Sequence, residues 1–244
     1  MGKTMREALD ISAYLVIGPE NTEGRPVREI VRAALKAGFT CVQIRSKEAS
    51  AREMIALLGE AAEEIRAAGV SERVALLADD RLDVVLAARK MGIKADGVHV
   101  GQSDVPPEIC RAYLGEDAVV GLSARTDELL SYVRDTDTSM IDYFGAGPLH
   151  ETATKPDCGR DSQGNIITRS FEEIAELARV SKIPVVVGGG VKLADIPALA
   201  KTGVDGFFVV SAVAGAPDPE KAAKELVDAW QVGKAAASSA KKSE

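Results

Sequence analysis

The chain alternates between short apolar runs and longer amphipathic stretches. Runs rich in β-branched residues predict strands, and stretches with apolar residues three or four positions apart predict helices. The first strand is expected at residues 13–18 and the first helix at residues 26–38, with Pro26 at its start and Gly38 at its end. The same pairing continues to the last helix, with seven more strands expected at residues 41–46, 74–79, 97–102, 118–124, 142–148, 184–190 and 206–212.

Eight strand-helix pairs in one chain of 244 residues predict an α/β fold, a single (β/α)8 TIM barrel. A doubly wound open sheet is the alternative, but five or six pairs would complete it. We expect one domain over residues 1–233, because no shift in composition marks a second one. Residues 234–244 are small and polar, and are predicted to form a disordered tail.

One connection breaks the regular spacing. About twenty mostly polar residues, 149–169, separate the sixth strand from its helix, whereas such loops usually hold roughly two to six. In a barrel this long loop lies on the face where active sites are built. Its distal half could equally be an insertion without a function.

Composition narrows the classes of function. Thirty Lys and Arg against 37 Asp and Glu give a net charge of −7, which argues against a nucleic-acid partner. Three cysteines without CxxC spacing exclude a disulfide framework and a tetrathiolate zinc site. Without a long apolar run or a signal-peptide core, we expect no membrane association and a cytoplasmic location.

Polar residues and glycines gather at the carboxyl ends of the predicted strands, which is where barrel enzymes bind substrate. In chain order they are Gln43, Arg45, Lys47, Asp79, Asp80, Asp104, Ser123, Thr152, Thr154, Lys155, Gly190 and Ser211, and Val210 joins them through its backbone. Seven strand ends carry such groups, and this repetition indicates an enzyme.

The second strand places two cations on one face. Gln43, Arg45 and Lys47 share a face by the period of two, and we expect that face to point inward. Because an unpaired buried cation is costly, either a carboxylate of a neighbouring strand or an anionic ligand must balance these charges. A third cation in the long loop, Lys155, favours an anionic ligand.

Asp80 and Asp104 follow adjacent strands, so their side chains are expected to converge. Magnesium is commonly bound by one or two carboxylates together with phosphate oxygens of the substrate. The alternative is that each aspartate sits at a helix entry, with Asp80 as an N-cap. Arg45, Lys47, Lys155 and one Mg²⁺ exceed the two carboxylates by three positive charges, which matches a diphosphate ester of about −3.

A second anion site is expected where Gly188–190 and Val210–Ser211 follow the last two strands. Backbone amides there form the phosphate site of many barrels. Two such sites imply two phosphorylated small molecules as substrates. We interpret His99, inside the fourth strand, as a hydrogen-bonded core residue rather than a base.

These residues also resemble a known family, the thiamine-phosphate synthases. The matching segments occur in the family's order from about residue 13 to residue 230: YLVIG, VQIRSK, LLADDRLDVV, ADGVHVGQSD, VGLSA, DYFGAGPLHETATK, GGGV and VVSAV. The resemblance implies a (β/α)8 barrel. It also implies an enzyme that joins 4-amino-5-hydroxymethyl-2-methylpyrimidine diphosphate to a thiazole phosphate, carboxylated in bacteria, and releases diphosphate.

The resemblance further implies roles for single residues. It places the pyrimidine diphosphate on Gln43, Arg45, Lys47, Asp79, Ser123 and Lys155, with Arg45, Ser123 and Lys155 catalytic. It places Mg²⁺ on Asp80 and Asp104, and the thiazole phosphate on Thr152, Thr154, Gly190, Val210 and Ser211. The implied mechanism is dissociative: diphosphate departs, and the thiazole nitrogen captures the pyrimidine methylene cation.

The chain departs from the family pattern at two places. Asp79 stands where the family usually has Asn, and the loop after Lys155 is longer than usual. Two rival functions are a thiazole tautomerase and a non-catalytic phosphate-binding barrel. The first would need a histidine near Ser123, and the second would be expected to lose the carboxylates or Lys155. Assembly into a homo-oligomer is left open.

Overall fold

The computed structural model describes residues 2–152, 159–161 and 163–241. Eight parallel strands form a closed barrel in sequence order, and the last strand pairs with the first. The strands are β1 (Ala13–Ile17), β2 (Cys41–Ile44), β3 (Ala75–Asp79), β4 (Gly97–Val100), β5 (Val119–Ser123), β6 (Tyr143–Ala146), β7 (Val185–Val187) and β8 (Gly206–Val209). The closed barrel confirms the predicted fold and excludes the open sheet.

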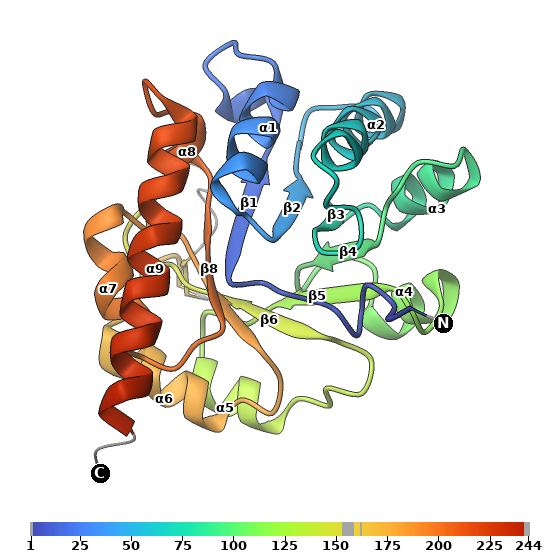
Figure 1. Ribbon diagram of the computed structural model, residues 1–244. Coiled ribbons are helices and arrows are strands. Elements are labelled where there is room, and N and C mark those ends of the chain that lie inside the picture. Colours follow the sequence, from blue (N-terminus) through green and yellow to red (C-terminus); the bar gives the residue numbers. More distant parts are fainter. Residues whose placement is uncertain (1, 153–158, 162, 242–244) are drawn as a thin grey trace.

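Helices surround the barrel, as Figure 1 shows. They are α1 (Val27–Ala37), α2 (Ala51–Ala67), α3 (Leu82–Lys90), α4 (Pro107–Leu114), α5 (Leu129–Asp135), α6 (Phe171–Val180), α7 (Ile196–Leu199), α8 (Ser211–Ala214) and α9 (Pro219–Lys241). Short 3-10 helices, η1 (Pro19–Asn21) and η2 (Leu193–Asp195), precede α1 and α7. The helical segment between β7 and β8 is therefore short, a 3-10 turn followed by a single α-helical turn.

Alternate residues of each strand face opposite sides of the barrel wall. Leu15 and Val42 belong to the large apolar core between strands and helices, whereas Tyr14 and Cys41 belong to a separate cluster inside the barrel. Gln43 is 3% exposed and bonds to Tyr14 within that interior. The period of two therefore predicted the inward face of β2 correctly.

Glycines make room for aromatic rings inside the barrel. A Cβ atom on Gly121 would lie 2.2 Å from Cζ of Tyr143, and one on Gly188 would lie 2.2 Å from the ring of Phe208. Neither distance is compatible with a side chain. These two glycines thus allow large rings to pack under the mouth of the barrel.

The last helix extends further than the sequence suggests. Residues 234–241 continue α9, where a disordered tail is expected from residue 234. Alanine has the highest helix propensity, and adding residues to an existing helix requires no new nucleation. Lys234 also ties this end to the barrel, because its Nζ donates to the carbonyl of Val204 at 3.0 Å and lies 5.3 Å from the ring centre of Trp230.

The long connection between β6 and α6 is present as predicted, since β6 ends at Ala146 and α6 begins at Phe171.

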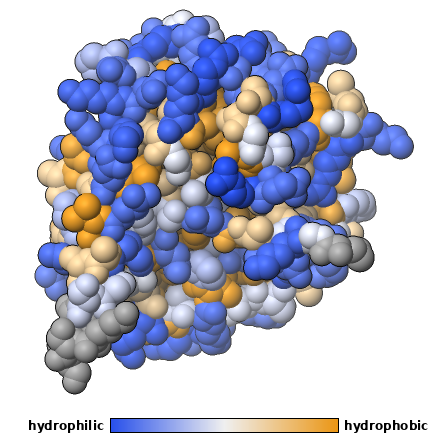
Figure 2. All heavy atoms as spheres, in the orientation of Figure 1, coloured by the Kyte–Doolittle hydropathy of each residue, from blue (hydrophilic) through white to orange (hydrophobic). Residues whose placement is uncertain are grey.

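Figure 2 shows that hydrophilic residues cover much of the face in view, with apolar residues between them. In the part of the chain that the structure describes, no helix is long and apolar enough to cross a membrane.

Candidate active site

A large cavity opens at the carboxyl ends of the strands. Its volume of about 1290 Å³ exceeds the roughly 300–1,000 Å³ of a typical small-molecule site, so two small ligands fit. All described candidate residues line it: Gln43, Arg45, Lys47, Asp79, Asp80, Asp104, Ser123, Thr152, Gly190, Val210 and Ser211. Thr154 and Lys155 lie outside the described residues. The strand ends thus brought distant positions together as the sequence predicts.

The two cations that follow β2 are paired with carboxylates of the neighbouring strand. Nε of Arg45 lies 3.2 Å from Oδ2 of Asp79, and Nζ of Lys47 lies 3.6 Å from the same oxygen. Lys47 also forms an ion pair with Asp80. Burial lowers the pKa of Lys47, but the hydrogen bond to Asp80 and the negative charge of Asp79 raise it by a larger amount. The pKa of Lys47 therefore lies above its ordinary value. The ion-pair alternative is therefore realised, and it does not exclude an anionic ligand because the Lys47 side chain is 55% exposed.

Asp80 does not cap the following helix. Its backbone has φ of +60°, which is uncommon for a residue with a side chain, and its N–H donates to the carbonyl of His99 at 2.7 Å. The N-cap of α3 is Arg81, which makes no capping hydrogen bond through its side chain. The capping alternative is wrong, and the Asp80 carboxylate is directed to Lys47 at the cavity.

Asp104 lies beside Asp80. Its Oδ2 accepts a hydrogen bond from the backbone N–H of Gly101 at 2.8 Å, and the N-cap of α4 is Pro106. Burial raises the pKa of Asp104, and a hydrogen bond with Asp80 raises it further. Both carboxylates line the same cavity, as expected from their places after adjacent strands.

This pair of carboxylates fits magnesium. Hard oxygen ligands suit Mg²⁺, which is usually bound by one or two carboxylates and completes its shell with water and phosphate oxygens. Among the described residues, no group of three or more His, Cys, Asp or Glu could hold a metal ion. The protein would thus supply Asp80 and Asp104, and the remaining ligands would come from substrate and water.

A hydrogen-bonded chain runs from Asp79 into the barrel interior. Nε2 of Gln43 donates to Asp79, and the hydroxyl of Tyr14 donates to Oε1 of Gln43 at 2.5 Å. The hydroxyls of Tyr14 and Tyr143 lie 2.8 Å apart. Burial raises the pKa of both tyrosines well above the ordinary value, so both remain neutral hydroxyls.

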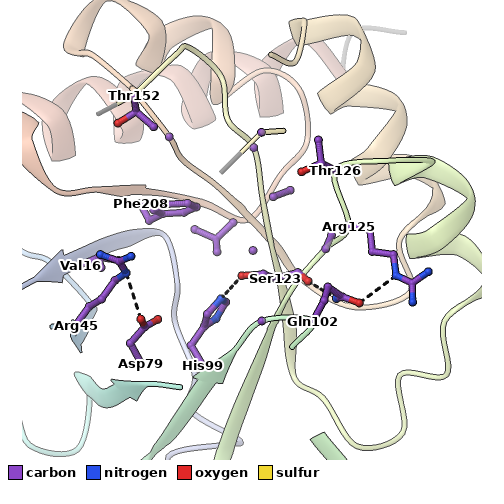
Figure 3. A pocket seen from close by; sticks show the side chains of 18 of the residues that line it. Val16, Arg45, Asp79, His99, Gln102, Ser123, Arg125, Thr126, Thr152 and Phe208 are labelled. Carbon is purple, nitrogen blue, oxygen red and sulfur yellow. Dashed lines mark hydrogen bonds and ion pairs between the residues drawn. The ribbon is translucent and has the colours of Figure 1, made fainter. Parts of the chain in front are cut away.

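The same chain reaches the fifth strand through a histidine. Nδ1 of His99 lies 2.9 Å from the Tyr143 hydroxyl, and Nε2 lies 2.9 Å from Oγ of Ser123. Figure 3 shows Ser123 between His99 and Gln102, whose Nε2 donates to the Ser123 carbonyl at 2.7 Å. His99 is hydrogen-bonded as expected, but it is not a core residue, because it is only partly buried and lines the cavity.

Sequence reasoning missed that the two tyrosines connect these residues. Tyr14 shares the inward face of β1 with Val16, and Tyr143 belongs to the same interior cluster. The period of two could have placed both side chains inside the barrel. It could not have shown that they meet each other between Gln43 and His99.

The loops after β7 and β8 both line the cavity, through Gly189–190 and Val210–Ser211. Gly189 and Gly190 have φ of +79° and +72°, and a Cβ on Gly190 would lie 2.9 Å from Cβ of His150. The N–H groups of Leu149 and His150 each donate to the carbonyl of Gly189 at 3.0 Å. Helix α8 begins at Ser211, and the first amides of a helix have no partner within it. The geometry is compatible with the predicted phosphate site.

A family model described as thiamine monophosphate synthase matches residues 13–213. The chain belongs to this family. It is 39% identical over 230 residues to the thiamine-phosphate synthase of Corynebacterium efficiens, covering 94% of this chain and 100% of that one. It is 36% identical to the thiamine-phosphate synthase of Natronomonas pharaonis, covering 90% and 95% of the two chains. The resemblance inferred from the sequence motifs is confirmed.

One solved structure agrees with this family assignment, and a second shares the fold. The thiamine phosphate pyrophosphorylase from Pyrococcus furiosus superposes with a TM-score of 0.75 at 29% identity, covering 94% of this chain and 98% of that one. The 3-hexulose-6-phosphate synthase from Salmonella typhimurium superposes with a TM-score of 0.66 at 16% identity, covering 91% and 100%. The second similarity shows a shared barrel fold only.

Proposed function

We propose that the chain is a magnesium-dependent thiamine-phosphate synthase. It would join 4-amino-5-hydroxymethyl-2-methylpyrimidine diphosphate to a thiazole phosphate, release diphosphate and form thiamine phosphate. The observation that carries the proposal is the convergence of Asp80 and Asp104 beside Lys47, at a cavity with room for two ligands, in a chain of this family.

The charges of the site favour a metal. Arg45 and Lys47 face the three carboxylates of Asp79, Asp80 and Asp104, so this described cluster is one charge negative. A diphosphate would be repelled by it. One Mg²⁺ on Asp80 and Asp104 reverses the sign, and the predicted cation Lys155 would add one more charge. The net charge of the site is then +2 rather than the +3 expected from sequence, because Asp79 belongs to the cluster.

Bound Mg²⁺ would supply positive charge to the departing diphosphate. Lys47 is half exposed and can turn from its carboxylates toward that ligand. Arg45 is 14% exposed and held by Asp79, so it would act as a fixed charge. Preorganised charge of this kind stabilises a transition state without rearranging during the reaction.

The bond changes need no protein nucleophile. The bond from the pyrimidine methylene carbon to the diphosphate oxygen breaks, and its electron pair leaves with diphosphate. The lone pair of the thiazole nitrogen then forms the new bond to carbon. Ser123 would contact the pyrimidine, while Thr152, Gly190, Val210 and Ser211 would hold the thiazole phosphate. The chain's main contribution would be to orient the two substrates.

The rival isomerase is less well supported. A thiazole tautomerase would use a histidine at the end of the fifth strand, and Ser123 occupies that place. The decisive experiment supplies the purified chain with both substrates and Mg²⁺ and measures thiamine phosphate and diphosphate. A parallel reaction follows isomerisation of the thiazole phosphate alone. Equal amounts of both condensation products support the proposal, and isomerisation without condensation contradicts it.

Asp104→Asn is the control for this assay, because removal of the carboxylate should abolish the magnesium-dependent part of the activity.

Cytoplasmic location and the oligomeric state stay predictions. A fractionation of cells that express the tagged chain would test the first, and light scattering of the purified protein would test the second.

A further inference from the structure

The buried hydrogen-bonded chain has a direction. We call its members the relay; in order they are Asp79, Gln43, Tyr14, Tyr143, His99 and Ser123. We propose that Asp79 is a positioning residue that orients every hydrogen bond of the relay, fixes His99 in the Nδ1–H form and makes Ser123 a hydrogen-bond acceptor toward the cavity.

The carboxylate end sets the orientation of Gln43. Asp79 lies between Arg45 at 3.2 Å and Lys47 at 3.6 Å, and an ionised carboxylate can only accept hydrogen bonds. Gln43 must therefore present its NH₂ group to Asp79. Its carbonyl oxygen, Oε1, then faces Tyr14 and requires a donor.

The two tyrosines pass this orientation on, because each hydroxyl has a single hydrogen. Tyr14 donates its hydrogen to Gln43 at 2.5 Å, so it can only accept from Tyr143 at 2.8 Å. Tyr143 thereby uses its own hydrogen and must accept from His99. Nδ1 of His99, 2.9 Å away, consequently carries a hydrogen.

In a neutral imidazole, a hydrogen on Nδ1 leaves Nε2 as an acceptor. The hydroxyl of Ser123 then donates to Nε2 at 2.9 Å, and its lone pairs remain for the cavity that Ser123 lines. The site at Ser123 thus accepts a hydrogen bond from the ligand. This step rests on the proposed function: the Ser123 hydroxyl would accept a hydrogen bond from the amino group of the pyrimidine.

Asparagine at position 79 would reverse the relay. Arg45 can only donate, so the side-chain oxygen of Asn would face Arg45 and its NH₂ group would face Gln43. Gln43 would turn its NH₂ group to Tyr14, each following bond would invert, and His99 would carry its hydrogen on Nε2. Ser123 would then offer a hydrogen instead of a lone pair.

The test is nitrogen NMR of the ligand-free, ¹⁵N-labelled protein at a pH where His99 is neutral. The chain has only two histidines, and His150→Gln assigns the signals. We expect the protonated nitrogen of His99 to be Nδ1 in the wild type and Nε2 in Asp79→Asn. Asp83→Asn, an exposed aspartate paired with Arg81, should leave the tautomer unchanged.

Tyr143→Phe interrupts the relay and separates positioning from a general structural effect. In that background, Asp79→Asn should no longer move the hydrogen of His99. A wild-type ring protonated on Nε2, or an unchanged tautomer in Asp79→Asn, overturns the proposal. Even if a variant fails to fold, a wild-type ring protonated on Nε2 is enough to reject the predicted direction of the relay. Because the readout needs neither substrate nor turnover, it is independent of whether the proposed reaction occurs.

Discussion

Nε of Arg45 lies 3.2 Å from Oδ2 of Asp79, so the innermost cation of the site is already paired across two strands. The side chain of Arg45 is 14% exposed and that of Asp79 is 7% exposed, which shields the pair from solvent. This pairing offsets part of the positive charge that Arg45 presents to a diphosphate. Binding of the anion then depends more strongly on the metal and on Lys47.

The carboxylates should therefore control anion binding through magnesium. We expect Asp80→Asn and Asp104→Asn each to lower turnover by at least about 100-fold, since roughly 3 kcal/mol of charge stabilisation is lost. Titration calorimetry with inorganic pyrophosphate should show binding with Mg²⁺ and weaker binding, by about tenfold or more, in EDTA. Asp83→Asn is the control. Full activity of EDTA-treated protein would contradict the metal site.

The two anion sites should respond differently to a change at Gly190. Its φ is +72°, and an added Cβ would lie 2.9 Å from His150, so Gly190→Ala distorts the loop after β7. We expect the affinity for thiazole phosphate to fall by about tenfold or more and that for pyrimidine diphosphate to change by less than about threefold. Calorimetry with each substrate measures both.

Gly24→Ala is matched for backbone strain, because Gly24 has φ of +84° and nothing within 4 Å of an added Cβ. It should leave both affinities unchanged. Similar weakening of both substrates by Gly190→Ala would mean that this loop does not serve the monophosphate alone.

The barrel interior should not tolerate a methyl group at Gly121. Because a Cβ there would lie 2.2 Å from the ring of Tyr143, we expect Gly121→Ala to lower the free energy of unfolding by roughly 1–3 kcal/mol. In Gly59→Ala the new Cβ on helix α2 meets only Ile93 at 3.6 Å, and stability should rise by about 0.5–1 kcal/mol. Urea unfolding compares the two, and a neutral Gly121→Ala would refute the packing argument.

Helices α1 and α2 are joined by an ion pair whose strength should depend on pH. Nε of Arg32 lies 2.8 Å and Nη2 of Arg28 lies 2.9 Å from oxygens of Glu64. Hydrogen bonds from Arg32 and then Arg28 hold the pKa of Glu64 below its ordinary value of 4.5, against the opposite effect of burial. A lowered folded-state pKa stabilises the fold above the unfolded pKa, and this contribution is lost as the pH falls through the folded pKa.

Glu64→Gln should thus lower the free energy of unfolding by about 1 kcal/mol at pH 7, a modest value because both arginines are partly exposed and screened. The difference from wild type should shrink as the pH falls below 4.5. Glu63→Gln, which removes an exposed carboxylate 3.9 Å from Arg28, should change stability by less than about 0.5 kcal/mol. Equal losses at pH 7 and at low pH would contradict the ionic origin.

The sequence by itself determined the barrel and the face on which its chemistry lies. Strand and helix periods are local properties, so residues 41–47 already show that Cys41 and Gln43 face inward. Parallel strands joined by helices bring their carboxyl ends to one side, and this rule gathered Asp80, Asp104 and Ser123 correctly. Thr154 and Lys155 lie outside the described residues and stay predictions.

Only the tertiary structure decided which inward side chains meet. Tyr14 and Tyr143 are 129 positions apart in the chain, and their contact depends on the stagger and closure of eight strands. The pairing of Arg45 with Asp79 and the left-handed backbone of Asp80 depend in the same way on the neighbouring strand. A local period fixes the side of the barrel wall that a residue faces, but not its height along the barrel axis. The partners inside the barrel are set by that height.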